Sequence, residues 1–414
     1  MSDATRVAQG SGHAGAEILF VIGTLEVGGT ERHLATLAPA LVKLGWIVSV
    51  YSLAGGGALR DELQGEGVNV LVPRFKTAAA RSSVIGRLAQ SVRIGAHLFS
   101  VMRQRRPAIV HFFLPAAYLV GAPAAISAGV PVRIMSRRSL NVYQRSYPLV
   151  QNLERRLHRW MSAILGNSRS VVRELAETED VPVRRLGLIY NGIDVARFTD
   201  AGSRAATRLE LGLGPQTLTL VIVGNLIPYK GHGDLLAALG QSAPRLPQDW
   251  RLLIVGRDEG IASSLQAQAA ELCIGDKVSF LDTRNDVPEI LNASDIGVLC
   301  SHQEGFSNAV LEGMASGLPM IVTDVGGNAE AVLDGESGIV VPPHDPVHLA
   351  DAIVRLANDP PLRARLGDAG RRRMAEHFAL DRSIGAYDAL YRALQSGVAP
   401  GDIHEVRVTD WLRD

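Results

Sequence analysis

Two glutamates, Glu304 and Glu312, lie on either side of a segment whose sequence predicts the start of a helix. The apolar run at 295–300 is typical of a buried parallel strand. Ser307 or Asn308 can cap the helix, so Glu312 falls just over one turn inside it and Glu304 stays in the preceding loop. Free N–H groups at a helix start form an anion site, and carboxylates accept hydrogen bonds from sugar hydroxyls. The pattern suits a nucleotide sugar, with Glu304 at the hexose, the helix start at the diphosphate and Glu312 at the ribose; a capped helix with two solvated acids is the alternative.

A loop at 224–231 follows a second predicted strand and contains a lysine, Lys230. From this position Lys230 would point into a cleft and neutralise a diphosphate leaving group. A surface lysine in a turn is the alternative. Arg257, at the end of the next predicted strand, is a candidate for a second positive charge.

Glycine pairs precede two other predicted helices. Gly29 and Thr30 belong to the Gly-Gly-Thr-Glu segment at 28–31, where backbone amides can approach a phosphate or an acceptor. A plain tight turn explains this segment equally well, because the full dinucleotide fingerprint is missing. The glycine pair at 326–327 leads to a helix at the same edge of the second sheet.

The sequence carries no pattern of a metal or cofactor site. It has no Asp-x-Asp pair, no His or Cys residues with metal-ligand spacing, and neither a Gly-x-Ser-x-Gly nor a Walker A element. His111, inside the predicted strand at 108–114, either touches substrate or is a buried structural histidine. We therefore expect an electrostatic mechanism without a metal or a cofactor.

Composition indicates a folded chain of two or three domains, because 47% of its 414 residues are hydrophobic and 20% are charged. Its two cysteines, Cys273 and Cys300, share no motif, which favours a reducing compartment. The first residues are small and polar and lack the apolar core of a signal peptide. These features predict a cytoplasmic protein.

The zero net charge hides an asymmetry between the two halves. Residues 1–185 hold 23 Lys and Arg against 12 Asp and Glu, whereas the remainder holds 19 against 30. A basic first half suits an anionic acceptor or the inner face of an anionic membrane, to which the protein would bind peripherally. No nucleic-acid motif is present, so we expect no nucleic-acid partner. A solvated basic face without a partner is the alternative.

Predicted strands and helices alternate along the chain, which indicates two doubly wound α/β domains facing each other across a cleft. The stretch at 108–132 has no charged residue, but its prolines favour a strand followed by a helix over a membrane span. The expected parts of the chain are a flexible tail (1–16), an N-terminal acceptor-binding domain (17–195), a C-terminal nucleotide-sugar-binding domain (196–380), a helix crossing back to the N-terminal domain (381–396) and a tail (397–414).

Taken in order, these segments resemble glycosyltransferase family 4, which has the GT-B architecture and retains the anomeric configuration of the transferred sugar. The matches cover most of the chain and are specific as an ordered set. They are Gly28-Gly29-Thr30-Glu31, Asn167-Ser168, Tyr190-Asn191-Gly192-Ile193-Asp194, Gly224 with Lys230-Gly231, Asp286-Val287-Pro288, Ser301-His302-Gln303-Glu304-Gly305-Phe306, Glu312-Gly313-Met314-Ala315-Ser316-Gly317-Leu318-Pro319, Gly326-Gly327-Asn328-Ala329-Glu330 and Asp345.

The resemblance implies roles for individual residues. Glu304 would contact the hexose, Glu312 the ribose, and Lys230 the diphosphate, while the leaving phosphate takes the acceptor proton. The expected catalytic residues are Glu304, Lys230 and Arg137. The expected donor-binding residues are Gly29, Asn225, Lys230, Arg257, Glu304, Gly305, Phe306, Ser307, Asn308 and Glu312, and those on the acceptor side are Thr30, His111, Arg137 and Arg138.

Two positions depart from the family pattern. Asn225 stands where the family often has arginine, which removes one cation unless Arg257 or Arg137 replaces it. Arg137 stands close to where many members carry a histidine at the end of an N-domain strand, and an arginine binds anions but cannot act as a general base. We therefore expect Arg137 and Arg138 to line the acceptor side.

The resemblance predicts transfer of a hexose or N-acetylhexosamine from a UDP- or GDP-sugar to a glycan or lipid-linked acceptor, as in polysaccharide biosynthesis. A nucleotide-sugar epimerase of the same architecture is an alternative, and so is a two-lobed binding protein without catalytic activity. An epimerase needs no acceptor, which separates the first alternative from a transferase.

Overall fold

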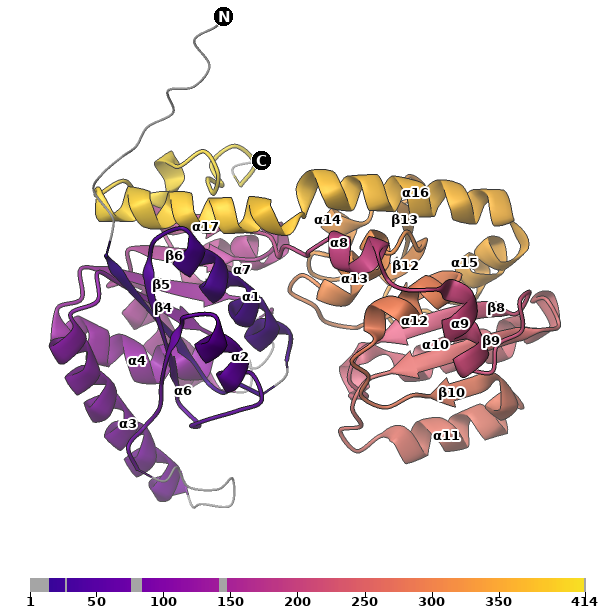
Figure 1. Cartoon of the computed structure of the whole chain (residues 1–414), viewed down its shortest axis with the longest axis horizontal. Helices are drawn as coiled ribbons and strands as arrows, with labels where there is room; N and C mark the ends of the chain where they lie inside the picture. The colour runs from indigo at the N-terminus through magenta and orange to yellow at the C-terminus, as the bar shows by residue number, and fades with distance from the viewer. Residues whose placement is uncertain (1–14, 27, 76–83, 141–146, 413–414) are drawn as a thin grey trace, which may run out of the picture. The chain divides into compact units, whose positions relative to one another are not determined.

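The computed structural model describes residues 15–26, 28–75, 84–140 and 147–412, which form two units (Figure 1). Unit 1 consists of the described residues up to Gly166, of 172–189 and of the chain from Ile384 onward. Unit 2 consists of 167–171 and 190–383. The expected tail at 1–16 lies, up to residue 14, outside the described residues.

Unit 1 is built on a parallel sheet of seven strands in the order β3-β2-β1-β4-β5-β6-β7. All of its strand pairs are parallel, and apolar residues dominate the central strands, as expected where helices cover both faces. The strands are β1 (Glu17–Ile22), β2 (Ile47–Ser52), β3 (Asn69–Leu71), β4 (Ile109–Phe113), β5 (Val132–Arg137), β6 (Ala163–Gly166) and β7 (Leu186–Leu188).

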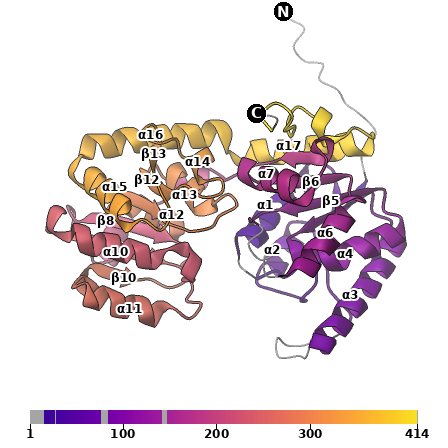
Figure 2. The ribbon, with the colours of Figure 1, turned by 180° about the vertical axis from the view of Figure 1, so that it is seen from behind.

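Successive side chains of β1 and β4 point to opposite faces of this sheet, where they enter different helix layers. Phe20 and Phe113 belong to a core that also contains residues of α1 and α17. Phe112 lies on the other side, against Gly121 of α4. Figure 2 shows α4 beside α3. The helices of unit 1 are α1 (Gly29–Lys43), α2 (Arg60–Gly65), α3 (Val84–Arg105), α4 (Pro115–Ala128), α6 (Pro148–His158), α7 (Arg169–Glu179) and α17 (Leu380–Gln395). The first residues of α7 and of α17 belong to unit 2.

The segment after α17 differs from the expected tail at 397–414. Ile403, Val406 and Val408 are buried, and the backbone N–H of Leu188 donates to the carbonyl of Val406 at 2.9 Å. A short 3₁₀ helix, η5 (Pro400–Asp402), begins this segment. The segment packs on unit 1 because its apolar residues are spaced to enter the core beside β7, a pattern too short to stand out in the sequence.

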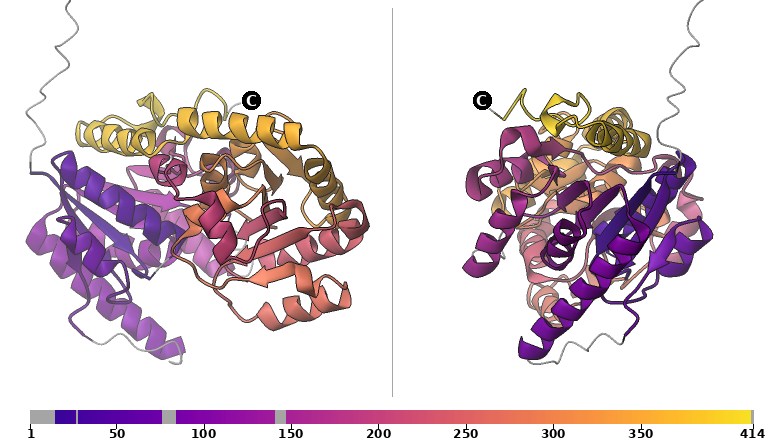
Figure 3. Two further views of the ribbon diagram at one scale, coloured as in Figure 1. Left: turned by 45° about the vertical axis from the view of Figure 1, so that its right-hand side comes forward. Right: turned by 90° about the vertical axis from the view of Figure 1, so that its left-hand side faces the viewer.

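Unit 2 is built on a parallel sheet of six strands in the order β10-β9-β8-β11-β12-β13 (Figure 3). All of its strand pairs are parallel, so the carboxyl ends of its strands meet at one edge. The strands are β8 (Leu218–Val223), β9 (Trp250–Val255), β10 (Val278–Phe280), β11 (Ile296–Leu299), β12 (Met320–Thr323) and β13 (Gly338–Val341).

Two apolar cores lie on the two faces of the second sheet. One contains Ile222, Ile254 and Val298 together with residues of α10, α11 and α15, and the other contains Val221 and Val322 with residues of α12, α13 and α16. The helices of unit 2 are α8 (Ala196–Thr199), α9 (Arg204–Glu210), α10 (His232–Ser242), α11 (Ala262–Glu271), α12 (Val287–Ala293), α13 (Asn308–Ala315), α14 (Asn328–Ala331), α15 (Pro346–Asn358) and α16 (Pro360–His377). Both α15 and α16 begin with proline after a capping aspartate, Asp345 and Asp359.

The uncharged stretch at 108–132 forms β4 and α4, as the prolines predicted. Pro115 lies in the first turn of α4, and Gly129 ends the helix in the left-handed conformation, with φ of 73°. Among the described residues, none of the helices combines the length and the apolar character that crossing a membrane requires.

Candidate functional site

The candidate site lies at the carboxyl edge of the sheet of unit 2, where Lys230 and Glu304 are joined directly. Lys230 Nζ donates to Glu304 Oε1 at 2.6 Å, and Ser301 Oγ donates to the same oxygen at 2.7 Å. Both charged side chains remain partly exposed, at 18% for Lys230 and 11% for Glu304. The two residues for which the sequence predicted different parts of one donor are therefore neighbours, on loops that follow β8 and β11.

The loop that carries Lys230 is held against the end of β11. Gly231 has φ of 73°, and a Cβ atom there would lie 2.0 Å from the carbonyl oxygen of Cys300, so this position requires glycine. The backbone N–H of His302 donates to the carbonyl of Tyr229 at 2.7 Å. These contacts fix the distance between the backbones of the two loops and bring Lys230 within reach of Glu304.

The glycine pair at 326–327 packs against the backbone of the loop that carries Glu304. The N–H of Gly327 donates to the carbonyl of Gly305 at 2.8 Å. Gly326 has φ of 55°, and a Cβ atom there would lie 2.0 Å from the carbonyl oxygen of Glu304. The structure thus gives this glycine pair a supporting role for the loop that carries Glu304.

Asn191, in one of the segments that resemble the family, holds the start of α13. Its Nδ2 donates to the carbonyl of Phe306 at 2.9 Å and to Oδ1 of Asn308 at 2.7 Å. Ser307 stands at the N-cap position with extended backbone, and Glu312 is half-buried one turn later. The first amides of α13 therefore have a fixed position beside Glu304, as an anion site at a helix start requires.

The other predicted cation is engaged elsewhere. Arg257 Nε donates to Glu259 Oε1 at 2.9 Å, and the Arg257 side chain is half-exposed. Asn225 is half-buried in the loop after β8, beside the hydrogen bond from the N–H of Leu226 to the carbonyl of Arg257. Arg257 thus pairs with Glu259 at the exposed surface, whereas Lys230 is the cation that contacts Glu304.

In unit 1, three predicted residues lie around the start of α1. Gly29 is the first residue of this helix and Thr30 is the second. Burial raises the pKa of the Glu31 carboxyl, and the positive charge of nearby Arg138 opposes this rise. Arg138 is 9% exposed and its guanidinium lies 5.8 Å from the centre of the Phe113 ring. Arg138, Gly29 and Thr30 are therefore placed where an anionic group could meet both a cation and helix amides.

His111 is the buried structural histidine of the two possibilities that the sequence left open. It is fully buried, with Nδ1 at 2.8 Å from the hydroxyl of Tyr391 and Nε2 at 2.7 Å from Oγ of Ser136. Burial, aided by the charge of Arg138, lowers its pKa to about 3. Its ring is thus neutral and engaged through both nitrogens, which corrects its placement on the acceptor side.

Arg137 also differs from its expected role at the acceptor. Its side chain is 1% exposed and donates to Glu154 at 2.9 Å and to Glu179 at 3.1 Å, and both of these carboxylates are completely buried. His158 Nε2 lies 2.6 Å from the same Glu179 oxygen. Consecutive side chains of β5 point to opposite faces, so Arg137 enters the layer of α6 and α7 while Arg138 points toward α1. Arg137 is therefore an internal ion-pair partner.

Known proteins match both halves of the chain. The family model "Glycosyltransferase Family 4" matches residues 27–197, and the model "Glycosyl transferases group 1" matches residues 203–373. D-inositol 3-phosphate glycosyltransferase of Streptomyces bingchenggensis is 32% identical over 250 residues, which are 56% of this chain and 55% of the relative. The protein of the same name from Saccharomonospora viridis is 36% identical over 228 residues, 53% of this chain and 52% of the relative. The chain thus spans about half the length of the curated relatives it matches.

Solved structures with low sequence identity share the fold. Anabaena Alr3699/HepE in complex with UDP has a TM-score of 0.78 at 22% identity, with 92% of this chain and 100% of that chain covered. Sucrose-phosphate synthase from Thermosynechococcus elongatus has a TM-score of 0.80 at 21% identity, with the same coverage. The two family models together account for most of the chain, and both sheets are those of the GT-B architecture. The chain belongs to glycosyltransferase family 4.

Proposed function

We propose that this protein transfers a hexose or N-acetylhexosamine from a UDP- or GDP-sugar to a hydroxyl group of a glycan or lipid-linked acceptor, with retention of the anomeric configuration. The bond between the anomeric carbon and the diphosphate breaks, and a bond to the acceptor oxygen forms on the same face of the sugar. The acceptor proton goes to an oxygen of the leaving diphosphate. The chain supplies the charge for this step through Lys230 and helix amides, without a metal at the diphosphate.

The observation that carries this proposal is the Lys230–Glu304 pair beside the start of α13. A lysine ammonium has three donors, so Lys230 can bind a phosphate oxygen while it still contacts Glu304. Glu304 has a second oxygen for a sugar hydroxyl, and Glu312 is close along α13 for the ribose. One site can therefore receive the three parts of a nucleotide sugar.

The comparisons support the donor class. Alr3699/HepE was crystallised in complex with UDP-glucose and with UDP and glucose, and its fold covers 92% of this chain. The curated relatives are named for transfer to D-inositol 3-phosphate, an acceptor that carries a phosphate. Arg138 beside the start of α1 fits an anionic acceptor of this kind, so phosphorylated inositol belongs in an acceptor screen beside glycans and lipid-linked sugars.

The test begins with a thermal-shift screen of UDP, GDP and ADP and of their sugars, because a ligand that binds the folded state raises the melting temperature. The best donor is then incubated with candidate acceptors, nucleotide release is measured, and NMR gives the anomeric configuration of the product. Donor without acceptor is run in parallel, since conversion to an epimer under that condition would favour the epimerase.

Lys230→Ala should lower kcat/KM by about 10²–10³-fold, the usual loss for one donor to the developing charge. Lys277→Ala is the matched control, because Lys277 lies before β10, at the amino edge of the same sheet, where its Nζ donates to the carbonyl of Gln248. Equal kcat/KM for Lys230→Ala and Lys277→Ala would refute the proposed site.

A further inference from the structure

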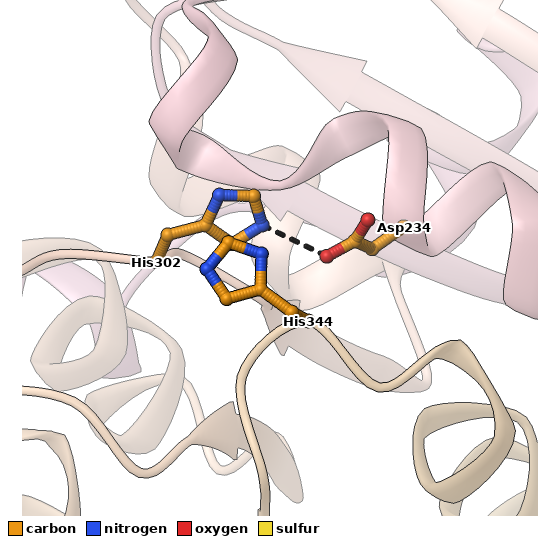
Figure 4. Close-up of side chains that lie close together, drawn as sticks. All are labelled: Asp234, His302 and His344. Atoms are coloured by element: carbon orange, nitrogen blue, oxygen red, sulfur yellow. Dashed lines mark hydrogen bonds and ion pairs between the residues drawn. The ribbon is translucent and has the colours of Figure 1, made fainter.

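Three residues distant in the sequence, Asp234, His302 and His344, lie together on unit 2 (Figure 4). Asp234 comes from the first turn of α10, His302 from the loop after β11, and His344 from the loop after β13. Sequence spacing gave no sign of this group, because the ligand pattern exists only after the strands of the sheet have assembled.

The three side chains are in contact, with the two imidazole rings packed against each other. His302 Nε2 lies 2.8 Å from Asp234 Oδ2. The rings of His302 and His344 have centres 3.7 Å apart, and one ligand atom from each of the three residues lies within 4.8 Å of the others. Ligand atoms around a tetrahedral zinc ion are about 3.3 Å apart, given bonds of about 2.0–2.1 Å. The three ligand atoms, which lie within 4.8 Å of one another, would have to move closer by side-chain rotation to bind one ion.

The backbone at each of the three positions is restrained. The N–H of His302 donates to the carbonyl of Tyr229, and Asp234 is part of a regular helix. His344 has φ of 58°, a left-handed conformation that residues other than glycine seldom adopt. This conformation places the exposed imidazole of His344 against that of His302. A hydrogen bond to Asp234 needs only one of the two histidines, so it does not account for the second.

We propose that Asp234, His302 and His344 bind a zinc ion, with water completing the coordination shell. Two imidazoles, a carboxylate and one open position are a common ligand set for Zn²⁺ in proteins. The partial exposure of His302 and Asp234 and the exposure of His344 leave an entry path for the ion. The ion would cross-link α10 and two loops of unit 2.

The position of this site links it to the proposed donor site, and this part of the inference rests on the proposed function. Lys230 lies just before α10, and Glu304 lies two residues after His302. A zinc ion would therefore restrain both loops that carry the Lys230–Glu304 pair. The ion has a structural role in this arrangement, and the transfer step itself does not pass through it.

The test is direct binding to the untagged full chain after treatment with a chelator and its removal. Isothermal titration with ZnCl₂ should give one site per chain, and titration with CoCl₂ should give the visible absorption bands of a tetrahedral site. His344→Gln and Asp234→Asn should each weaken zinc binding by at least about tenfold, since losing even an indirect partner of a ligand costs about 10–100-fold. Zinc should raise the melting temperature of the unmodified protein more than that of His344→Gln.

His348→Gln is the matched control, because His348 also forms a pair with an aspartate, Asp345, and is exposed. It should bind zinc as tightly as the unmodified protein. Absence of a one-to-one zinc site, or unchanged affinity in His344→Gln, would overturn the inference. His344 is exposed, so its replacement leaves the core intact, and the binding measurement uses no donor, so it is independent of whether the proposed transferase activity is found.

Discussion

Replacing Arg137 by methionine should destabilise unit 1 strongly, because it would leave two buried carboxylates without the guanidinium that donates to both. Glu154 and Glu179 are fully buried, and Arg137 donates to both. Removing one partner of a buried ion pair costs about 3–5 kcal/mol, a large fraction of the roughly 5–15 kcal/mol that stabilises a folded protein. For a unit of about 150–250 residues this loss corresponds to a drop of about 6–20 °C in melting temperature.

The assay is urea unfolding followed by fluorescence and circular dichroism, with Arg155→Met as the matched control. Arg155 lies on the same helix as Glu154 and pairs with Asp180, but both members of that pair are exposed, Arg155 at 38% and Asp180 at 73%. An exposed pair contributes about 0–1 kcal/mol, so the control should change stability little. Adding Glu154→Gln and Glu179→Gln to Arg137→Met should recover part of the loss, because neutral amides are less costly to bury than carboxylates that have lost the guanidinium. A change below about 1 kcal/mol for Arg137→Met, equal to that of the control, would refute the internal ion-pair role and return Arg137 to the acceptor side.

Two other predictions follow from the described geometry. Gly326→Ala should raise the donor KM and cost at least about 1–2 kcal/mol for the left-handed backbone, because the new Cβ would lie 2.0 Å from the carbonyl oxygen of Glu304. Gly335 has φ of 70° and no described atom within 4 Å of the new Cβ. Gly335→Ala should therefore lower the free energy of unfolding measured with urea but leave the donor KM unchanged. Burial holds the pKa of His111 near 3 against an ordinary 6.5, so the folded state binds fewer protons between these values and stability should fall as the pH drops below 6.5. The loss from this residue is about 2 kcal/mol between pH 6.5 and 5, and His111→Gln should reduce the slope; an unchanged slope in urea unfolding would contradict the buried neutral state.

Much of the fold was predictable from local pattern. The apolar run at 295–300 contains β11, and the uncharged stretch at 108–132 contains β4 and α4, as the sequence indicated. Among the helices that were not predicted are α15 and α16, although aspartate followed by proline at their starts is a helix-start signal. In α6 and α7 the buried faces include Glu154 and Glu179, so charged residues interrupt the apolar periodicity that would reveal these helices.

The sequence predicted at which strand ends the site residues lie, but not the contacts between them. The rule that ligands bind at the carboxyl edge of a parallel sheet correctly grouped Lys230 with Glu304. It could not reveal that the two side chains contact each other, or that Asn191 holds the start of α13, because those contacts depend on loop conformation. Alternation along β5 says that Arg137 and Arg138 point to opposite faces. Which face leads to the start of α1 depends on the handedness of the strand crossovers, and that is a property of the assembled sheet.

Charge balance explains how the proposed donor site works with Asn225 where the family often has arginine. A diphosphate brings at least two negative charges, and Lys230 already contacts Glu304 at 2.6 Å, while Arg257 is paired with Glu259. The start of a helix contributes the equivalent of about half a positive charge, and its free amides supply directed hydrogen bonds that a flexible side chain cannot match in position. Because Asn191 anchors the start of α13 through Phe306 and Asn308, these amides are preorganised and need no rearrangement when phosphate charge develops. In the proposed donor site, diphosphate binding would therefore depend more on backbone dipoles and less on arginine, and the Asn191 contacts that hold the start of α13 would contribute to it.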